Sequence, residues 1–517
     1  MNNANNIFAA ALLQDDINRS KSRMPGFTFL VGCLLILLIH AQLVTWAGPV
    51  GLVWLFFSTA LLLFTSHLAA LTLLLAALLL QNTVIAMVAP QITEHSIFSI
   101  LQATSFLITL ICACLALPVW LRMHDYLKRE YKPLLRSMIW LVVVIAVYCV
   151  YGLAHTDASS AVTYARTFLS GALMLTVGIV FGLQVSPRQA AHITSVFAIV
   201  MIAWGFAELL VPRELYTMFN AADFLHLKFA GASDILAFSQ VSDVLNFEKH
   251  SYLNLSGIFG LDLVTLRLRG PSFHPITFAY SAAFCCLLCF IYREDLLALG
   301  CYLVVLLIGA KGALLLTTLS AVLYLFYKIT RNPGWYKIAL VTALLFYVVI
   351  ALFYGSATRD YHFVGLMGGI KGFLHNPLGY GVGVGGNLSE QGKQDLVTKM
   401  STIQNVGGDY GFESGVGVGL YQLGIGFTAI IAFFYQMWRQ VWYVAQEHND
   451  NPRLMIIPSV YAILLANSLF QEEAFSPVGW GLWFLFGGML IANRWREHGV
   501  IKSHEVSHDK YAIPKTR

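Results

Sequence analysis

Apolar segments of about 20 residues with few charges recur along the whole chain, and they limit its fold more than any other feature. Coiled as an α-helix, a segment of this length crosses the hydrocarbon core of a bilayer. Hydrophobic residues make up 58% of the 517 residues and charged residues only 11%, against about 25% charged residues in soluble domains. The apolar runs are continuous, whereas the strands of a membrane β-barrel alternate over about 10 residues. The sequence therefore predicts an all-α, polytopic integral membrane protein.

We expect about fourteen transmembrane helices, each roughly long enough to span a bilayer, in one membrane domain over residues 27–493. A cytoplasmic segment, 1–26, precedes this domain and a cytoplasmic tail, 494–517, follows it. The expected crossings are 27–46, 50–65, 68–89, 97–121, 137–154, 166–183, 191–211, 275–292, 296–310, 312–327, 338–354, 416–438, 454–470 and 478–493.

Lys and Arg are spread unevenly over the connections between these segments. With the N-terminus in the cytoplasm, the larger share falls on the cytoplasmic side, including the clusters Arg19–Arg23 and Arg122–Arg136. Positively charged loops stay on the cytoplasmic side of a membrane. This bias predicts that both termini are cytoplasmic. Membrane topology is therefore enough to explain the basic loops, and we expect no nucleic-acid partner.

Two long connections, 212–275 and 355–415, are predicted to face the other side. Loops longer than about 15 residues are usually functional or disordered. The first contains many large apolar residues, which favours short amphipathic helices against the membrane. The second is rich in glycine. Residues that bind or react are concentrated on such loops when a rigid scaffold holds them.

Arg267 and Arg269 end the first long loop, just before an apolar helix that begins near Pro275. Arginine presents a planar fork of donors that matches a phosphate group. The pair is a candidate site for a lipid-linked diphosphate; alternatively, both side chains reach from the membrane interface into water. His274 is either a hydrogen-bonding group for a ligand or a packed histidine.

Lys311 lies between two apolar runs, where a charge in mid-bilayer would cost about 2.5–3.5 kcal/mol. We therefore expect it near the surface that carries the long loops, or facing a polar cavity. An anion-binding role and an interfacial lysine both remain open.

The second long loop opens with Arg359 and Lys371 and continues with closely spaced glycines, including Gly381 and Gly383. Successive backbone N–H groups in such a stretch can form an anion-binding nest. Tight turns without a ligand explain the glycines equally well.

Glu413 stands just before the apolar helix that begins near Val416. The helix dipole favours a carboxylate at that position, and a carboxylate beside arginines can also act as a general base. Glu472 and Glu473 form a second acidic pair, which we expect to be solvated loop charges.

Three local patterns follow one another in the second half of the chain. The first is Arg269-Gly270 followed by Pro275, before a membrane helix. The second runs from Arg359 to Gly383 and contains Asn376-Pro377-Leu378-Gly379-Tyr380-Gly381. The third is Glu413-Ser414, nine residues and Gly424. Together, over roughly residues 260–440, they resemble the O-antigen polymerase and O-antigen ligase superfamily of bacterial membrane glycosyltransferases.

This chain departs from the ligase pattern in three places. Glu413 replaces the ligase histidine, Phe427 occupies a position that is normally Gly, Thr or Tyr, and Lys311 stands where Ser-Arg-Gly is common. The Glu-Ser pair resembles repeat-unit polymerases more than ligases. It moves the role of general base from an imidazole to a carboxylate.

The resemblance implies a GT-C-like polymerase of O-antigen or exopolysaccharide repeat units in the bacterial inner membrane, with a periplasmic active site. It implies a metal-independent, inverting transfer from an undecaprenyl-diphosphate-linked oligosaccharide to a lipid-linked acceptor sugar. Arg269 and Arg359 would stabilise the leaving diphosphate and Glu413 would be the base, with Arg267, His274, Lys311, Lys371, Gly381 and Gly383 in substrate binding. No cofactor is expected; membrane lipids, a chain-length regulator and a flippase are the expected partners.

Two alternatives remain. An O-antigen ligase or oligosaccharyltransferase would use the same donor with another acceptor. A lipid-glycan flippase or transporter belongs to a different class. Transporters often show inverted repeats and broken helices, and no repeat is evident in this sequence.

Overall fold

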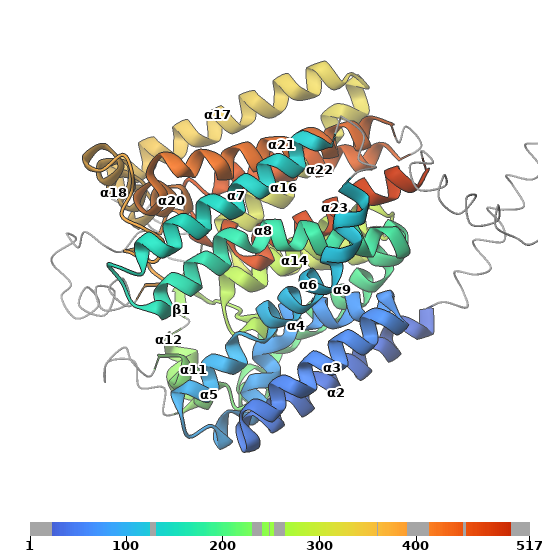
Figure 1. Cartoon of the computed structure of the whole chain (residues 1–517), viewed down its shortest axis with the longest axis vertical. Coiled ribbons are helices and arrows are strands. Elements are labelled where there is room, and N and C mark those ends of the chain that lie inside the picture. Colours follow the sequence, from blue (N-terminus) through green and yellow to red (C-terminus); the bar gives the residue numbers. More distant parts are fainter. Residues whose placement is uncertain are drawn as a thin grey trace, which may run out of the picture.

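The computed structural model describes residues 23–124, 131–229, 240–247, 249–252, 264–358, 360–389, 413–447 and 451–497. In these ranges the chain forms one helical bundle with a single two-stranded hairpin (Figure 1). The long helices are α2 (Arg23–Ala47), α3 (Pro49–Thr65), α4 (His67–Val88), α6 (Thr104–His124), α7 (Lys132–Gly152), α8 (Ala158–Gln184), α9 (Pro187–Leu210), α14 (Pro275–Ile291), α15 (Asp295–Ile308), α16 (Lys311–Thr330), α17 (Pro333–Thr358), α21 (Thr428–Glu447), α22 (Ile456–Asn467) and α23 (Leu482–Glu497).

Shorter elements connect these helices. They are η1 (Ala89–Gln91), α5 (His95–Gln102), α10 (Pro212–Met218), α11 (Ala221–Phe229), α12 (Val241–Phe247), β1 (Lys249–Ser251), β2 (Val264–Leu266), η4 (Gly270–Ser272), α18 (Tyr361–His375), α20 (Gly415–Leu423), η5 (Gly424–Phe427), η6 (Pro452–Met455), η7 (Glu472–Phe475) and the π-turn η8 (Pro477–Gly481).

The prediction of an all-α membrane protein is confirmed. Within the described ranges, eight helices are long and apolar enough to cross a membrane, or nine if α5 and α6, bent by 46°, form one span. Twelve of the fourteen expected segments each coincide with one long helix, whereas 97–121 covers α5 and α6, and 416–438 covers α20, η5 and the first part of α21. Several of these helices are shorter than a full span. The count of fourteen crossings therefore stays a prediction.

The break between α5 and α6 is closed by one side chain from α4. Gln81 donates a hydrogen bond to the carbonyl of Gln102 (2.9 Å) and accepts one from the N–H of Ser105 (2.7 Å). A broken helix exposes backbone groups that hydrocarbon cannot satisfy. This amide therefore allows the bend to exist inside an apolar bundle.

The core of the bundle is formed by helices that are distant in sequence. α4 is apolar on all sides and mostly buried, as expected for a central helix. α8 packs closely on α23, because Gly178 and Gly182 leave room for the backbone of Leu485 and Met489. Such small residues let two membrane helices approach closely.

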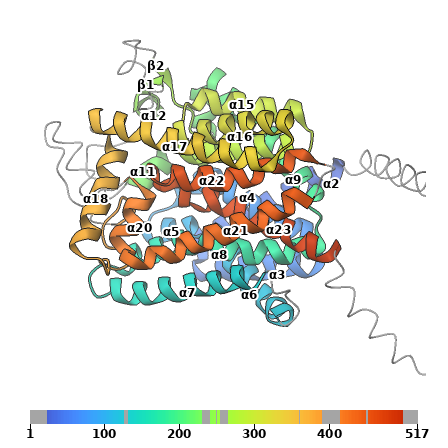
Figure 2. The ribbon, with the colours of Figure 1, turned by 90° about the horizontal axis from the view of Figure 1, so that it is seen from above.

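Figures 1 and 2 place α11, α12, α18 and α20 together at one end of the bundle. We call it the loop-bearing end, because both long loops start and finish there. The short helices expected in the first loop are present as α10, α11 and α12. The antiparallel hairpin, which pairs His250 with Thr265, was not predicted, since three-residue strands leave no readable alternation.

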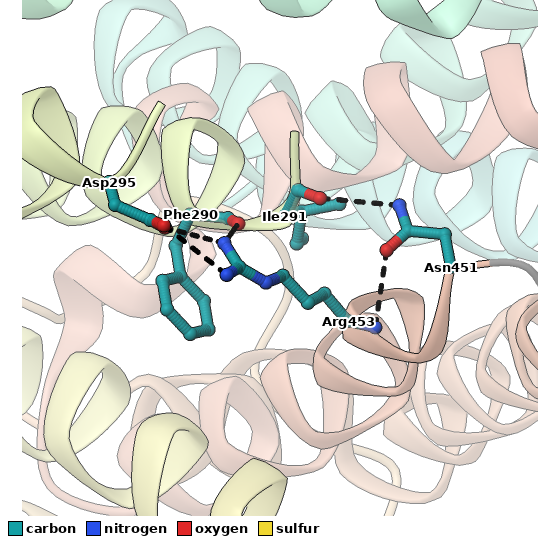
Figure 3. Close-up of polar contacts among 5 residues, drawn as sticks. All are labelled: Phe290, Ile291, Asp295, Asn451 and Arg453. Atoms are coloured by element: carbon teal, nitrogen blue, oxygen red, sulfur yellow. Dashed lines mark hydrogen bonds and ion pairs between the residues drawn. The ribbon is translucent and has the colours of Figure 1, made fainter. Parts of the chain in front are cut away.

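At the other end, Arg453 joins the turn between α14 and α15 to the start of α22 (Figure 3). Its guanidinium donates to the carbonyl of Phe290 (2.7 Å) and to the carboxylate of Asp295 (2.5 and 3.3 Å). It also lies 4.4 Å from the ring centre of Phe290. Asn451 adds a hydrogen bond to the carbonyl of Ile291 (3.2 Å). A second clamp at the same end joins Arg494 to Glu447.

Candidate functional site

The motif from Arg269 to Pro275 forms a tight turn, η4, that leads into α14. Gly270 has a φ of 62°, and a Cβ there would lie 2.1 Å from the ring of Phe278. Only glycine fits both constraints. Two side chains of α4 hold the turn from the other side: Asn82 donates to the carbonyl of Ser272 (2.6 Å) and Thr83 to that of Pro271 (2.7 Å).

A buried carboxylate on α9 fixes the first residue of this turn. Glu208 accepts hydrogen bonds from the N–H groups of Arg269 (2.6 Å) and Gly270 (2.8 Å) and from the hydroxyl of Tyr216 (2.5 Å). Hydrogen bonds to an ionised acceptor are stronger than neutral ones. The side chain of Arg269 is only 3% exposed. The arginine is therefore held in place rather than reaching freely into water.

His274 caps α14 and lies among cations. Its Nδ1 accepts the N–H of Thr277 (3.3 Å). Burial lowers the pKa of His274 well below its usual value, and the nearby charges of Lys228, Arg267 and Arg269 lower it further. A neutral imidazole results, because both effects disfavour the charged form. The structure thus gathers three cationic side chains from α11 and the end of the first loop around one helix N-terminus.

Thr277 connects these cations to a group of carboxylates. Its hydroxyl donates to Glu473 Oε1 (2.8 Å). Burial raises the pKa of Glu473, while the hydroxyls of Thr277 and Ser476 and the charge of Lys228 lower it. Lys228 therefore lies within electrostatic reach of both His274 and Glu473.

The neighbouring Glu472 has an unusual environment for a carboxylate. Its Oε1 is buried and accepts no hydrogen bond. Burial raises the pKa of Glu472 to about 8, with further increases from Glu473 and Glu413 and an opposing effect of the Tyr164 hydroxyl. The prediction that Glu472 and Glu473 are solvated loop charges was wrong. They follow an apolar helix in sequence, but η7 leaves them only partly exposed.

Glu413 lies beside this pair. Its carbonyl accepts the N–H of Glu472 (3.0 Å), and its carboxylate Oε2 lies 3.4 Å from His362 Nδ1 on α18. The cap of α20 is formed by Ser414 instead, whose hydroxyl accepts the N–H of Gly417 (2.9 Å) and donates to the carbonyl of Leu469 (2.7 Å). Capping the helix therefore does not require Glu413, whose side chain is 42% exposed.

The glycine-rich stretch packs closely against three helices. A Cβ at Gly381 would lie 2.5 Å from the Cα of Gly152, and one at Gly383 would lie 2.6 Å from the Cα of Ala161. The N–H of Gly381 donates to the Gln422 carbonyl (2.9 Å) and that of Gly383 to Gln422 Oε1 (3.1 Å). Both N–H groups are used within the protein, which favours the tight-turn interpretation over an anion nest.

The second and third sequence patterns also contact each other. The N–H of Ile425 donates to the carbonyl of Pro377 (2.8 Å). A Cβ at Gly424 would lie 2.2 Å from the same carbonyl oxygen, and Gly424 has a φ of 51°. Asn376 closes the turn by donating to the carbonyl of Gly379 (2.6 Å). Two motifs separated by long stretches of sequence thus form one packed unit.

The remaining predicted residues are less closely connected to this site. Lys311 begins α16 with an exposed side chain, 5.6 Å from the ring centre of Tyr354. Its neighbour Gly312 packs against Gln471, next to Glu472. Lys371 is exposed on α18. Arg359 lies outside the described residues.

The structure therefore brings Arg267, Arg269 and His274 together and links them to Glu413 through Thr277 and the η7 carboxylates. Sequence reasoning missed three contributors, Glu208, Lys228 and His362, because their partners are remote in the chain, and it misjudged the environment of Glu472. Glu208 could have been identified from the sequence, because it is a carboxylate inside an otherwise apolar helix. Among the described residues, no group of three His, Cys, Asp or Glu side chains is placed to hold a metal ion.

Comparison of the chain with known proteins gave no match to a family model, to a curated protein or to a solved structure.

Proposed function

We propose that this protein is a glycan polymerase of the bacterial inner membrane, in which fourteen crossings place the loop-bearing end in the periplasm. It transfers a glycan from undecaprenyl diphosphate to the sugar of a second lipid-linked repeat unit. The observation that supports this proposal most directly is the junction of Lys228, Arg267 and Arg269 with the acidic residues Glu413, Glu472 and Glu473. These cationic and acidic side chains lie at one end of an apolar bundle.

In the proposed reaction, an acceptor hydroxyl oxygen attacks the anomeric carbon of the donor sugar. A new C–O bond forms as the bond from that carbon to the diphosphate oxygen breaks, and the configuration inverts. The hydroxyl proton passes to the Glu413 carboxylate, and the electron pair leaves with undecaprenyl diphosphate. Arg269 and Arg267 stabilise the negative charge that develops there, and such fixed donors typically supply about 2.7–4 kcal/mol each to a transition state.

The burial of Arg269 fits this role. Its backbone is clamped by Glu208, so its position is set before a substrate arrives. Preorganised charges cost no rearrangement during reaction. Glu413 keeps a partly exposed carboxylate next to His362, as a base that must reach a substrate hydroxyl requires.

The test is polymer formation by the purified protein in lipid nanodiscs, supplied with lipid-linked repeat units and no ion gradient. Wild type is expected to produce a ladder of lengthening glycans, whereas Glu413→Gln yields none. Absence of polymer with wild type, together with gradient-dependent movement of the lipid-linked glycan, would instead indicate a transporter.

A deletion strain separates polymerase from ligase. Loss of a polymerase leaves single repeat units attached to the final acceptor, whereas loss of a ligase leaves polymer on the lipid carrier. The Glu-Ser pair at residues 413 and 414 favours the polymerase.

A further inference from the structure

A cavity of about 170 Å³ with a mixed polar and apolar lining lies beside the candidate site, between α4, α6, α8 and the η7–η8 turn. It holds on the order of ten water-sized groups, at about 10–15 Å³ for each. Its polar lining includes Gln81, Asn82, Arg166, Ser272, Thr277 and Glu473. Ser272 and Thr277 also belong to the turn and helix that carry Arg269 and His274, so the cavity shares a wall with the candidate site.

Arg166 is the most unusual part of this wall. The sequence suggests it as the first residue of a crossing, but α8 begins at Ala158, so the arginine lies two turns inside the helix. In the described part of the chain, Arg166 makes no hydrogen bond or ion pair with another residue. An arginine within a membrane helix is costly and usually functional. Arg166 lines the cavity, and none of its donors meets an acceptor among the described residues.

Glu473 brings the opposite charge to the same cavity, where it accepts a hydrogen bond from Thr277 (2.8 Å). Arg166 and Glu473 form no ion pair within 4.0 Å. A small anion would suit the arginine but would be repelled by the carboxylate. A hydroxyl group suits both, because it donates and accepts. Adjacent hydroxyls on a sugar ring present this combination repeatedly.

The rest of the lining suits the same type of ligand. Leu78, Leu79, Phe106, Pro477 and Val478 form the apolar part of the lining. Ligand sites commonly combine an apolar wall with a few well-placed polar groups. The C–H face of a sugar ring fits against the former and its hydroxyls against the latter.

We propose that this cavity is a subsite for one neutral sugar ring of the repeat unit, with Arg166 donating to one hydroxyl and Glu473 accepting from another. This inference rests on the proposed function and names part of the substrate that the site recognises. The shared wall with Thr277 places the bound ring next to the residues that would carry out transfer.

The experiment uses the full-length purified protein and the lipid-free repeat-unit oligosaccharide, released by mild acid from the carrier lipid of the host strain. Binding is measured by saturation-transfer NMR and titration, in parallel with polymerisation of lipid-linked repeats. Arg166→Gln and Glu473→Gln are expected to weaken oligosaccharide binding at least 10-fold. Arg136→Gln, the same change at an exposed position of α7, is expected to leave it unchanged.

Val478→Phe fills the cavity from its apolar wall and leaves the charges in place. It is expected to abolish binding while the protein keeps its elution volume, which separates occupation of the cavity from a folding defect. Wild-type affinity in this variant or in Arg166→Gln would overturn the subsite. So would the absence of saturable binding by wild type, or displacement by inorganic phosphate at lower concentration than by the oligosaccharide.

The two proposals fail in different ways. Normal polymerisation by Arg166→Gln, with an unchanged KM for the lipid-linked repeat, overturns the subsite and leaves the polymerase standing. If the wild-type protein makes no polymer but binds the oligosaccharide, and Arg166→Gln loses that binding, the polymerase proposal is overturned and the sugar site stands.

Discussion

The Glu413 carboxylate lies 3.4 Å from His362 Nδ1, and this contact joins the start of α20 to the first turn of α18. Asp360 caps α18 by accepting the N–H of His362 (3.2 Å). The histidine is therefore placed by its own helix end, while Glu413 is placed by its backbone contact with η7. The proposed base and its neighbour are thus positioned by separate elements.

This arrangement predicts unequal effects of two substitutions. Glu413→Gln removes the proposed base and should lower the transfer rate by about 10²–10⁴-fold. His362→Gln removes a partly exposed partner, worth at most about 1 kcal/mol, and should lower the rate by less than about 10-fold. Single-turnover rates with lipid-linked repeats measure both. Equal losses of rate in the two variants would indicate that His362, or the pair together, acts as the base.

Arg269 should be sensitive to a change that keeps its charge. Arg269→Lys retains a cation but loses the planar fork that matches a diphosphate, so the rate should fall by about 10²–10³-fold. Arg267→Lys, at a half-buried position, is the matched control and should have a smaller effect. Thermal unfolding of both variants checks that the η4 turn is intact. A rate near wild type for Arg269→Lys would argue against direct contact with the leaving group.

Glu472 should make stability depend on pH. Burial raises its pKa from 4.5 to about 8, so between these values the carboxyl is protonated in the folded protein and ionised in the unfolded chain. Folding then takes up a proton, and stability falls as pH rises through this window. Glu472→Gln should flatten the dependence of Tm on pH between about 5 and 8. A slope as steep as that of wild type would assign the effect to other groups.

Two glycine substitutions should act in opposite directions. Gly381→Ala places a Cβ 2.5 Å from Gly152 at a φ of 100°, and should destabilise by about 1–3 kcal/mol or more. At Gly32 on α2, a Cβ would meet nothing within 4 Å, so Gly32→Ala should be neutral or stabilise by up to about 1 kcal/mol. Unfolding in detergent compares the two. A neutral Gly381→Ala would mean that the glycine-rich turn shifts freely.

The clamp at Arg453 should contribute to stability without affecting transfer. Asp295→Asn removes one partner whose side chain is 58% exposed, and should cost less than about 1 kcal/mol. Arg453→Met also removes the hydrogen bond to Phe290 and the contact with its ring, and should cost about 2 kcal/mol. The rate per folded molecule should stay at the wild-type level. A lower rate would show coupling between the two ends of the bundle.

Most of the bundle could be read from the sequence, because an apolar segment in a membrane must satisfy its backbone internally and therefore forms a helix. The helix boundaries were harder to predict. α8 continues two turns beyond the expected start because Asp157 caps it, accepting the N–H of Ser160 (2.8 Å). Arg166, expected at the end of a crossing, lies within the helix as a result.

The candidate site was only partly predictable. Arg267, Arg269 and Glu413 stood out because each is a charge next to an apolar helix. Glu208, Lys228 and His362 did not, because their importance comes from contacts across more than 40 residues of sequence. Glu472 was misjudged for a related reason: whether a loop carboxylate is solvated depends on how η7 turns, and its turn is set by contacts with Glu413 and Ser476.

The hydrogen bond between Ile425 and Pro377 has a consequence for the stretch between Ser389 and Glu413. Pro377 precedes this stretch and Ile425 follows it, so their hydrogen bond helps to set the distance between the two ends of the stretch. Lengthening a chain segment between two fixed points costs only about 0.6 kcal/mol for each doubling. Insertion of an epitope tag or a fluorescent domain between Ser389 and Glu413 should therefore leave the bundle assembled.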